Sequence, residues 1–215
     1  MTSPAPSYSP PVAAPALTIP VVLGSVREHR LSEYPARLIA ERLTALGHTA
    51  PLVDLRALNL PMFGQPAAEG NGSGSDRSRD QSGVAQLRAA AASADAMVWL
   101  TPEYNHSFTS AVKNAVDYLH SEIRRKPMAV CGLSGGGLGG ARAVEQLKLV
   151  LIELHAVTIR DSVYFSDARG LFDSAGNLLR PEYERRIDDL IAELAWYAQV
   201  LTWGRTQVPL PIKSK

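Results

Sequence analysis

The sequence predicts an α/β protein in which helices cover both faces of a parallel sheet. Five short apolar runs have the length of buried strands, at 19–23, 50–53, 96–100, 128–133 and 157–165. Segments with apolar residues at helical spacing lie between and after these runs. Because parallel neighbours need a long crossover connection, strands that alternate with helices predict a parallel sheet.

Four of the predicted helices are supported by an apolar stripe at helical spacing. In chain order the stripes are Leu31, Leu38, Ile39, Leu43 and Leu46; Ala111, Val112, Ala115, Val116 and Leu119; Val144, Leu147, Leu151 and Leu154; and Ile187, Leu190, Ile191, Leu194, Ala198 and Leu201. Pro20 has no N–H to donate to a sheet, so we expect the first strand to begin at this residue or just after it.

Three segments have compositions that are not typical of a packed core. Residues 1–17 hold five prolines and no charge, which predicts a disordered arm. Residues 66–83 hold four glycines and four serines, which predicts a flexible loop, and 207–215 form a tail. The remaining span, 18–206, is expected to form a single domain.

The composition narrows the classes of ligand. The 22 basic and 21 acidic side chains give a net charge of +1, so the chain lacks the basic footprint of a nucleic-acid-binding protein. No run reaches the ~18 apolar residues of a membrane-spanning helix, and the late first basic residue, Arg27, argues against a secretory signal. The single cysteine, Cys131, forms neither an intrachain disulfide nor a multi-cysteine metal site. We therefore expect a cytoplasmic protein that binds small molecules and no metal.

The loop after the first strand has the chemistry of a phosphate site. It runs from Gly24 to Ser32 and carries two hydroxyl groups and two guanidinium groups, on Ser25, Arg27, Arg30 and Ser32. It leads directly into a helix, whose first amides favour an anion. The alternative is a solvated turn in which Ser32 is only the helix N-cap.

The loop after the third strand, 101–107, is stiffened by a proline and presents a phenol and an amide. Such a loop suits the edge of a flat heterocycle, because its backbone and polar side chains supply hydrogen bonds. We interpret Ser107 as the N-cap of the following helix. His106 is interpreted as a surface residue without a role, with contact to a ligand or substrate as the alternative.

The loop after the fourth strand has five glycines in the six positions 135–140, which predicts a close approach to a ligand or a neighbouring helix. Residues 132–136 also match the G-x-S-x-G turn of serine hydrolases around Ser134. A hydrolase would need an acid and then a histidine after Ser134. The only later histidine is His155, and the acids before it, Glu145 and Glu153, lie in the helix leading to it. That helix does not easily bring them to one site, which argues against a hydrolase. The G-x-G-x-x-G spacing of Gly135, Gly137 and Gly140, with Asp161 21 residues later, keeps a dinucleotide-binding dehydrogenase as the second hypothesis.

Taken together, the three loops resemble those of the NADPH-dependent FMN reductase family. The resemblance rests on GSVREHR at 24–30, PEYNHS at 102–107 followed by KNAVDYL at 113–119, and the glycine loop, and it extends from about Leu17 to Trp203. Two positions depart from the family pattern, since Thr109 stands where proline is usual and Val112 where leucine is usual. The resemblance implies a flavodoxin-like three-layer sandwich with strand order 2-1-3-4-5, in which all three loops line one crevice.

The resemblance also implies the residues that bind FMN. The phosphate would be held by Ser25, Arg27, Arg30 and Ser32. The edge of the isoalloxazine would meet Pro102, Glu103, Tyr104 and Asn105, largely through their backbone, and Ser134, Gly135, Gly136 and Gly137 would close the other side. Because the cofactor carries the chemistry, we name no catalytic acid or base. The amides of 102–105 are our candidates for stabilising negative charge on the flavin.

The implied activity is hydride transfer from NADPH or NADH to bound FMN, followed by electron transfer to a quinone, azo compound, free flavin or metal oxyanion. One alternative is a flavin-binding electron carrier or sensor that does not react with NAD(P)H, and another is a flavin-free dehydrogenase. Family members imply a homodimer or a homotetramer. The apolar residues of 54–63 suit a subunit contact, or they fold back onto the core.

Overall fold

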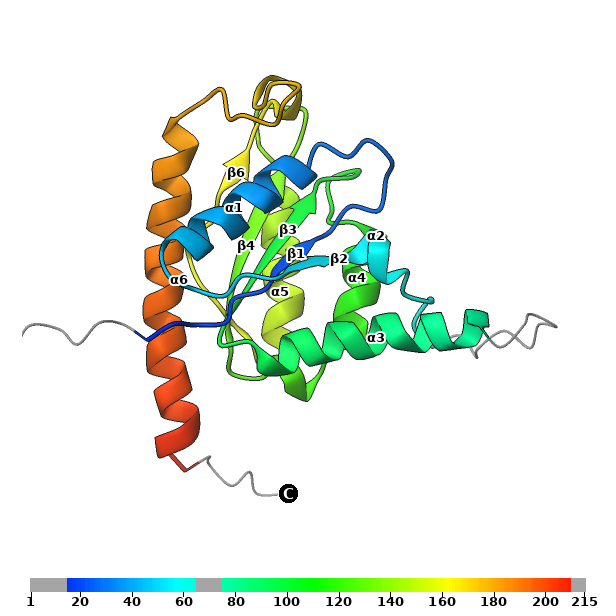
Figure 1. The fold of residues 1–215 in the computed structure, drawn as a ribbon, viewed down its shortest axis with the longest axis vertical. Coiled ribbons are helices and arrows are strands. Elements are labelled where there is room, and N and C mark those ends of the chain that lie inside the picture. Colours follow the sequence, from blue (N-terminus) through cyan, green and yellow to red (C-terminus); the bar gives the residue numbers. More distant parts are fainter. Residues whose placement is uncertain (1–14, 65–74, 210–215) are drawn as a thin grey trace, which may run out of the picture.

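The computed structural model describes residues 15–64 and 75–209, so most of the predicted arm and the end of the tail lie outside the described residues. Within these ranges the strands form one parallel sheet (Figure 1). The strands are β1 (Val21–Leu23), β2 (Leu52–Asp54), β3 (Met97–Pro102), β4 (Pro127–Leu133), β5 (Val157–Thr158) and β6 (Tyr164–Phe165).

The strand order confirms the flavodoxin-like arrangement. β1 pairs with β2 and β3, β3 pairs with β4, and β4 pairs with both β5 and β6, always in parallel. The order β2-β1-β3-β4-β5 places the ends of β1, β3 and β4 side by side. Val21 begins β1 directly after Pro20, as the missing N–H predicts.

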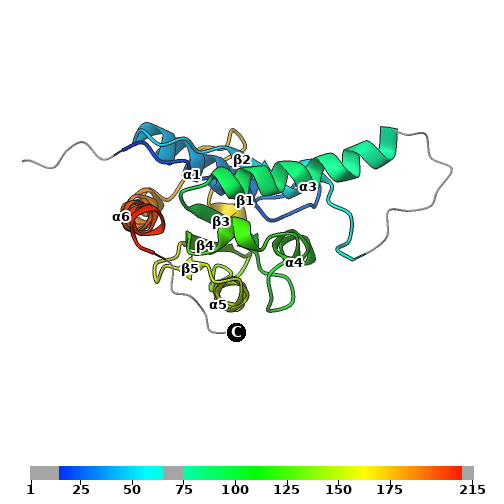
Figure 2. The same ribbon diagram turned by 90° about the horizontal axis from the view of Figure 1, so that it is seen from below.

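Helices cover both faces of the sheet, as predicted (Figure 2). On one face α1 (Glu33–Ala45) and α6 (Glu182–Gln207) pack against the strands, and on the other lie α3 (Ser75–Ser93), α4 (Ser110–Asp117) and α5 (Ala141–Glu153). A short helix, α2 (Leu55–Leu58), follows β2 directly, and two 3-10 turns are η1 (Ser121–Ile123) and η2 (Ala168–Gly170). The three layers therefore enclose two apolar cores, one on each side of the sheet.

Strand β3 illustrates why the strands read as continuous apolar runs. Val98 and Leu100 face the core under α1 and α6, whereas Met97 and Trp99 face the opposite core. Alternate side chains of a strand point to opposite faces, and here both faces are covered. Cys131 in β4 is fully buried, and burial raises the pKa of its thiol to about 12.

The long helix α6 contains the predicted apolar stripe. Five of its six members are buried, namely Ile187, Leu190, Ile191, Leu194 and Ala198, and Leu201 is partly buried. The hydroxyl of Tyr183, in the first turn, contacts Ser166 and the Tyr164 carbonyl. In the described part of the chain, no helix is both long and apolar enough to cross a membrane.

The fifth predicted strand, 157–165, is not one element. β5 ends at Thr158 and β6 begins at Tyr164. The side chains of Arg160, Asp161 and Ser162 fall between them, and Arg160 pairs with Asp161 at the surface. A run of polar residues does not suit a strand buried on both faces, so the chain leaves the sheet here and returns beside the far end of β4.

The predicted flexible loop 66–83 needs a correction. Residues 65–74 lie outside the described residues, but α3 begins at Ser75, inside the segment. Gly83 is a packing residue, because a Cβ atom there would lie 2.1 Å from the Leu58 carbonyl oxygen. The predicted arm also ends earlier than residue 17, since Leu17 is buried and its carbonyl accepts a hydrogen bond from Thr49.

Candidate functional site

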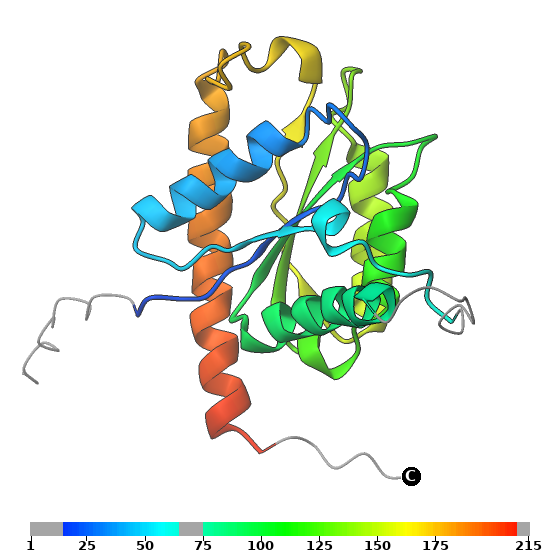
Figure 3. The same ribbon diagram turned by 45° about the vertical axis from the view of Figure 1, so that its right-hand side comes forward.

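The three chemically unusual loops meet at one edge of the sheet (Figure 3). They enclose a pocket of about 440 Å³. Of the twelve residues that the resemblance implies, all line this pocket except Asn105, Gly136 and Gly137, and these three line an adjoining hollow that shares Glu103 and Ser134. The predicted convergence is therefore present, and the binding roles of these residues stay predictions.

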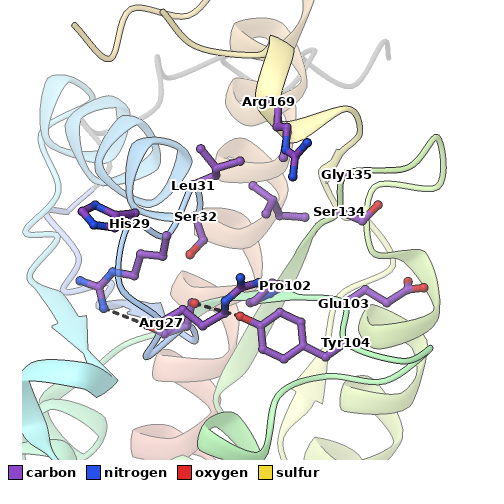
Figure 4. Close-up of a pocket in the computed structure, with 14 residues that line it drawn as sticks. Arg27, His29, Leu31, Ser32, Pro102, Glu103, Tyr104, Ser134, Gly135 and Arg169 are labelled. Atoms are coloured by element: carbon purple, nitrogen blue, oxygen red, sulfur yellow. Dashed lines mark hydrogen bonds between the residues drawn. The ribbon is translucent and has the colours of Figure 1, made fainter. Parts of the chain in front are cut away.

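Each loop is named here by the strand that it follows, so the first loop follows β1, the third follows β3 and the fourth follows β4. The first and third loops contact each other directly through Tyr104 (Figure 4). Its hydroxyl lies 3.2 Å from the Ser25 hydroxyl, and the Arg27 guanidinium lies 5.8 Å from the centre of its ring. A second connection runs beneath, where the Thr109 hydroxyl donates to the Gly24 carbonyl at 2.7 Å. Thr109 stands where the family usually has proline. Because proline has no hydroxyl group, it could not donate this hydrogen bond to Gly24.

Ser32 has a buried hydroxyl that the protein leaves without a partner. The residue is 1% exposed, its Oγ atom makes no hydrogen bond to a described residue, and it lines the pocket. It is the N-cap of α1 by position, but its side chain caps no amide. A buried hydroxyl without a partner is unfavourable, so an oxygen-rich ligand at this helix N-terminus would satisfy the hydroxyl. Ser32 and Arg27 therefore fit a phosphate group.

Arg30, in contrast, is committed to a protein partner. Its guanidinium donates two hydrogen bonds to Asp54, at 2.7 and 2.5 Å, and a third to the Ser25 carbonyl. The hydrogen bond to Asp54 raises the pKa of Arg30. Burial alone would raise the pKa of Asp54, but hydrogen bonds from Arg30 and from the Arg56 amide hold it below its ordinary value. Arg30 thus ties the first loop to the end of β2.

Most backbone amides of the third loop are used internally. Pro102 has no N–H, the Glu103 amide donates to the Leu133 carbonyl, and the Tyr104 amide donates to the Ser107 carbonyl. The expectation that the amides of 102–105 serve a ligand is therefore wrong for these residues, and Asn105 remains. Asn105 has a left-handed backbone, at φ 50°.

The third loop is also held by side chains of α5. The Glu103 carboxylate pairs with Arg142 at 2.8 Å, and Gln146 contacts both the Ser107 hydroxyl and the His106 carbonyl. Ser107 is not the helix N-cap that the sequence predicts. Thr109 fills that position, and its hydroxyl accepts the Val112 amide.

The end of β4 and the loop that follows it from Ser134, the fourth loop, contain two kinds of glycine. Gly132, Gly139 and Gly140 are packed, since a Cβ atom on each would lie within 3.0 Å of backbone. Gly135, Gly136 and Gly137 have no atom within 4 Å of such a Cβ, and none of them has a left-handed backbone. The protein's own packing therefore does not require glycine at 135–137, where open space borders the pocket.

One lining segment carries no signal in the sequence. Ala168 and Arg169 of η2 line the pocket, although they follow β6 and belong to none of the three loops. The Asp167 amide donates to the Gly136 carbonyl at 3.3 Å and the Ala168 amide to the Ser134 carbonyl at 3.1 Å. These contacts depend on the pairing of β6 with β4, which neither periodicity nor motif predicted.

The geometry contradicts the hydrolase hypothesis. Ser134 follows the end of β4 and donates to the Gly136 carbonyl, whereas the His155 carbonyl accepts the amide of Arg125, just before β4 begins. The seven residues of β4 separate the two by roughly 20 Å. Among the described residues, no group of three or more His, Cys, Asp or Glu side chains is placed to hold a metal ion.

Comparison with known proteins gives one consistent result. The family model described as NADPH-dependent FMN reductase matches residues 17–170. An NADPH azoreductase of Bacillus sp. (strain OY1-2) is 30% identical over 181 residues, which is 84% of this chain and 92% of that protein. A quinone reductase of Pseudomonas putida (strain KT2440) is 29% identical and covers 75% of this chain and 84% of its own.

Solved structures show the same fold. The flavoenzyme NAD(P)H:(acceptor) oxidoreductase FerB of Paracoccus denitrificans superposes with a TM-score of 0.68 at 22% identity, covering 86% of this chain and 98% of its own. A flavodoxin of Streptococcus pneumoniae superposes with a TM-score of 0.50 at 14% identity, over 83% of this chain and 97% of its own.

Proposed function

Because the chain belongs to the NADPH-dependent FMN reductase family, and is thus an oxidoreductase that uses FMN and NAD(P)H, we propose that its final electron acceptors are small quinones or azo compounds. Free flavins and metal oxyanions are further acceptors of the same proposal. The observation that carries it is that Ser25, Arg27, Ser32 and Tyr104 line one and the same pocket. The names of the azoreductase and quinone reductase relatives support this choice of acceptor.

Within this proposal, the first loop binds the phosphate of FMN. Arg27 supplies charge, and Ser25 and Ser32 supply hydroxyl groups at the N-terminus of α1. Arg30 acts as a positioning residue, because its pairing with Asp54 fixes the backbone on which Ser25 lies. Assigning Arg30 to position the loop, rather than to contact the phosphate, changes the role that the resemblance implies.

The third and fourth loops hold the ring of the flavin. Pro102, Glu103 and Tyr104 form a backbone rim without a free N–H, because Pro102 has none and the other two amides donate within the protein. The Asn105 amide is the donor left for a heteroatom of the ring edge. Gly135, Gly136 and Gly137 leave open space on the opposite side. When bound, FMN would supply the hydride and electron-transfer chemistry between NAD(P)H and the acceptor. The protein's own part is to orient these molecules and to exclude water.

The test is an absorbance spectrum of the full-length protein supplied with FMN. A flavin spectrum that bleaches on addition of NADPH under nitrogen, and returns when a benzoquinone or an azo dye is added, supports the proposal. A protein that binds FMN and stays oxidised with both NADPH and NADH is an electron carrier or sensor. A colourless protein that still binds NADH would support the flavin-free dehydrogenase.

The proposal includes a homodimer in the cytoplasm, with a homotetramer as the larger alternative. Met62 and Phe63 support a subunit contact, because they are 55% and 53% exposed, while Leu55 and Leu60 of the same segment fold back onto the core. The segment is fixed by Asn114, which contacts the Pro61 carbonyl and the Phe63 amide. Size-exclusion chromatography with light scattering measures the molar mass of the protein in solution. The mass of a monomer would contradict this part of the proposal.

A further inference from the structure

The charges at the pocket are unequally compensated. Arg30 pairs with Asp54 and Glu103 pairs with Arg142, so each of these lining residues is balanced locally. Arg27 contacts the Tyr104 ring but has no acidic partner among the described residues. Arg169 has neither a hydrogen bond nor an ion pair to any residue that the structure describes. Two uncompensated guanidinium groups therefore line one pocket.

The backbone that carries Arg169 is anchored at several points. The amides of Asp167 and Ala168 donate to the fourth loop, and the Asp167 carboxylate pairs with Arg180 at 2.6 Å. The Gly170 amide closes the turn on the Asp167 carbonyl. Figure 4 shows the Arg169 side chain extending from η2 toward the side of the pocket where Leu31 and Ser134 lie. The backbone of η2 is therefore fixed beside the pocket, and the Arg169 side chain that it carries is exposed.

We infer that Arg169 is a phosphate-binding residue, the second cation for the phosphoryl group of FMN beside Arg27 and Ser32. This inference rests on the proposed function. A phosphate monoester carries a charge of about −1.5 to −2 at neutral pH, so a single arginine does not balance it. Arg30 is already neutralised by Asp54, which leaves Arg169 as the remaining unpaired cation of the described pocket lining. An arginine also offers two parallel donors to phosphate oxygens.

The test compares two flavins that differ only in the phosphate. The wild-type full-length chain, freed of flavin, and its Arg169→Met variant are titrated with FMN and with riboflavin, following flavin fluorescence. We expect Arg169→Met to raise the dissociation constant of FMN by about ten-fold or more and to leave that of riboflavin within two-fold. The dependence of FMN binding on NaCl concentration also becomes shallower, because one charge contact is lost.

Arg185→Met is the matched control, since Arg185 is an exposed arginine of α6 outside the pocket. Arg169→Lys keeps the charge and is expected to recover part of the FMN affinity. Unchanged FMN affinity and salt dependence in Arg169→Met would overturn the inference, as would an equal loss for FMN and riboflavin. A change confined to the KM for NADPH would also overturn it and assign Arg169 to the nicotinamide nucleotide. If the wild-type chain bound no FMN, the proposed function itself would fail.

Discussion

The Ser25 hydroxyl lies 3.2 Å from the Tyr104 hydroxyl, although 79 residues separate them in the sequence. Ser25 follows β1 and Tyr104 follows β3, and these two strands pair with each other. The contact joins the loop that suits a phosphate to the loop that suits a ring. The two halves of the proposed FMN site are therefore connected through the Tyr104 phenol.

Replacing Tyr104 with phenylalanine removes this contact while keeping the ring beneath Arg27. We expect the dissociation constant of FMN to rise about two- to ten-fold, the effect of one ordinary hydrogen bond. Titration of flavin fluorescence measures the change. Tyr197→Phe, on a helix that does not line the pocket, serves as the control. Wild-type affinity in Tyr104→Phe would mean that the contact does not organise the site.

The two arginines of the first loop are expected to fail in different ways. Arg27→Ala should weaken FMN binding by about 1.5 to 3 kcal/mol, the range for a hydrogen bond to a charged group, with little effect on the free energy of unfolding. Arg30→Met should instead lower that free energy by about 1 to 3 kcal/mol, because Asp54 loses its partner. Urea unfolding and FMN titration of both variants separate the effects, and equal behaviour would refute the distinction.

The two kinds of glycine, one at the end of β4 and one in the fourth loop, give a matched pair. In Gly132→Ala the new Cβ would lie 2.6 Å from the Gly139 carbonyl oxygen, so we expect a loss of about 1 to 3 kcal/mol in stability. In Gly136→Ala the Cβ meets nothing within 4 Å, so stability should stay within about 0.5 kcal/mol while FMN binding weakens. Thermal unfolding and FMN titration test both statements. A stable Gly132→Ala protein would contradict the packing argument.

Lys126 predicts an increase in stability with pH. It is 9% exposed and donates to the carbonyls of Ala91 and Ala92, and burial lowers its pKa to about 8. In the unfolded chain a lysine keeps its proton up to about pH 10.4. Between these values the unfolded chain binds more protons than the folded protein, so the free energy of unfolding rises with pH.

We expect the stability of the wild type relative to Lys126→Met to rise by on the order of 2 to 3 kcal/mol between pH 7 and pH 10. Urea unfolding at both pH values measures the difference. Lys113→Met is the control, because the Lys113 side chain is 49% exposed and pairs with Asp117 at the surface of α4. A difference that stayed constant with pH would contradict the prediction.

The central strands β1, β3 and β4 were predictable because they are covered on both faces. Apolar runs such as the one around Trp99 need no long-range information, and the helix stripe from Ile187 to Ala198 follows from periodicity alone. The break after Thr158 was missed because three polar residues were averaged into an apolar run. Gly83 was misread as a loop residue because its reason is the Leu58 carbonyl, which is distant in sequence.

The site residues that directly follow strands could be predicted from the sequence. Pairings between side chains that are distant in the sequence could not. The convergence of Ser25, Tyr104 and Ser134 follows once the strand order is known. The pairing of Arg30 with Asp54 depends on β2 lying beside β1, so residue type alone did not distinguish Arg30 from Arg27. Arg169 lines the pocket because β6 pairs with β4, and no local sequence pattern predicts this pairing.

The buried position of Cys131 has a consequence for chemical resistance. Quinones are electrophiles that arylate thiolates, and peroxide formed when reduced flavins meet oxygen attacks the same species. A thiol in the centre of the sheet, with a pKa of about 12, presents almost no thiolate to either reagent. The single cysteine of the chain is thereby shielded both from quinone acceptors and from the peroxide by-product of the activity proposed for it.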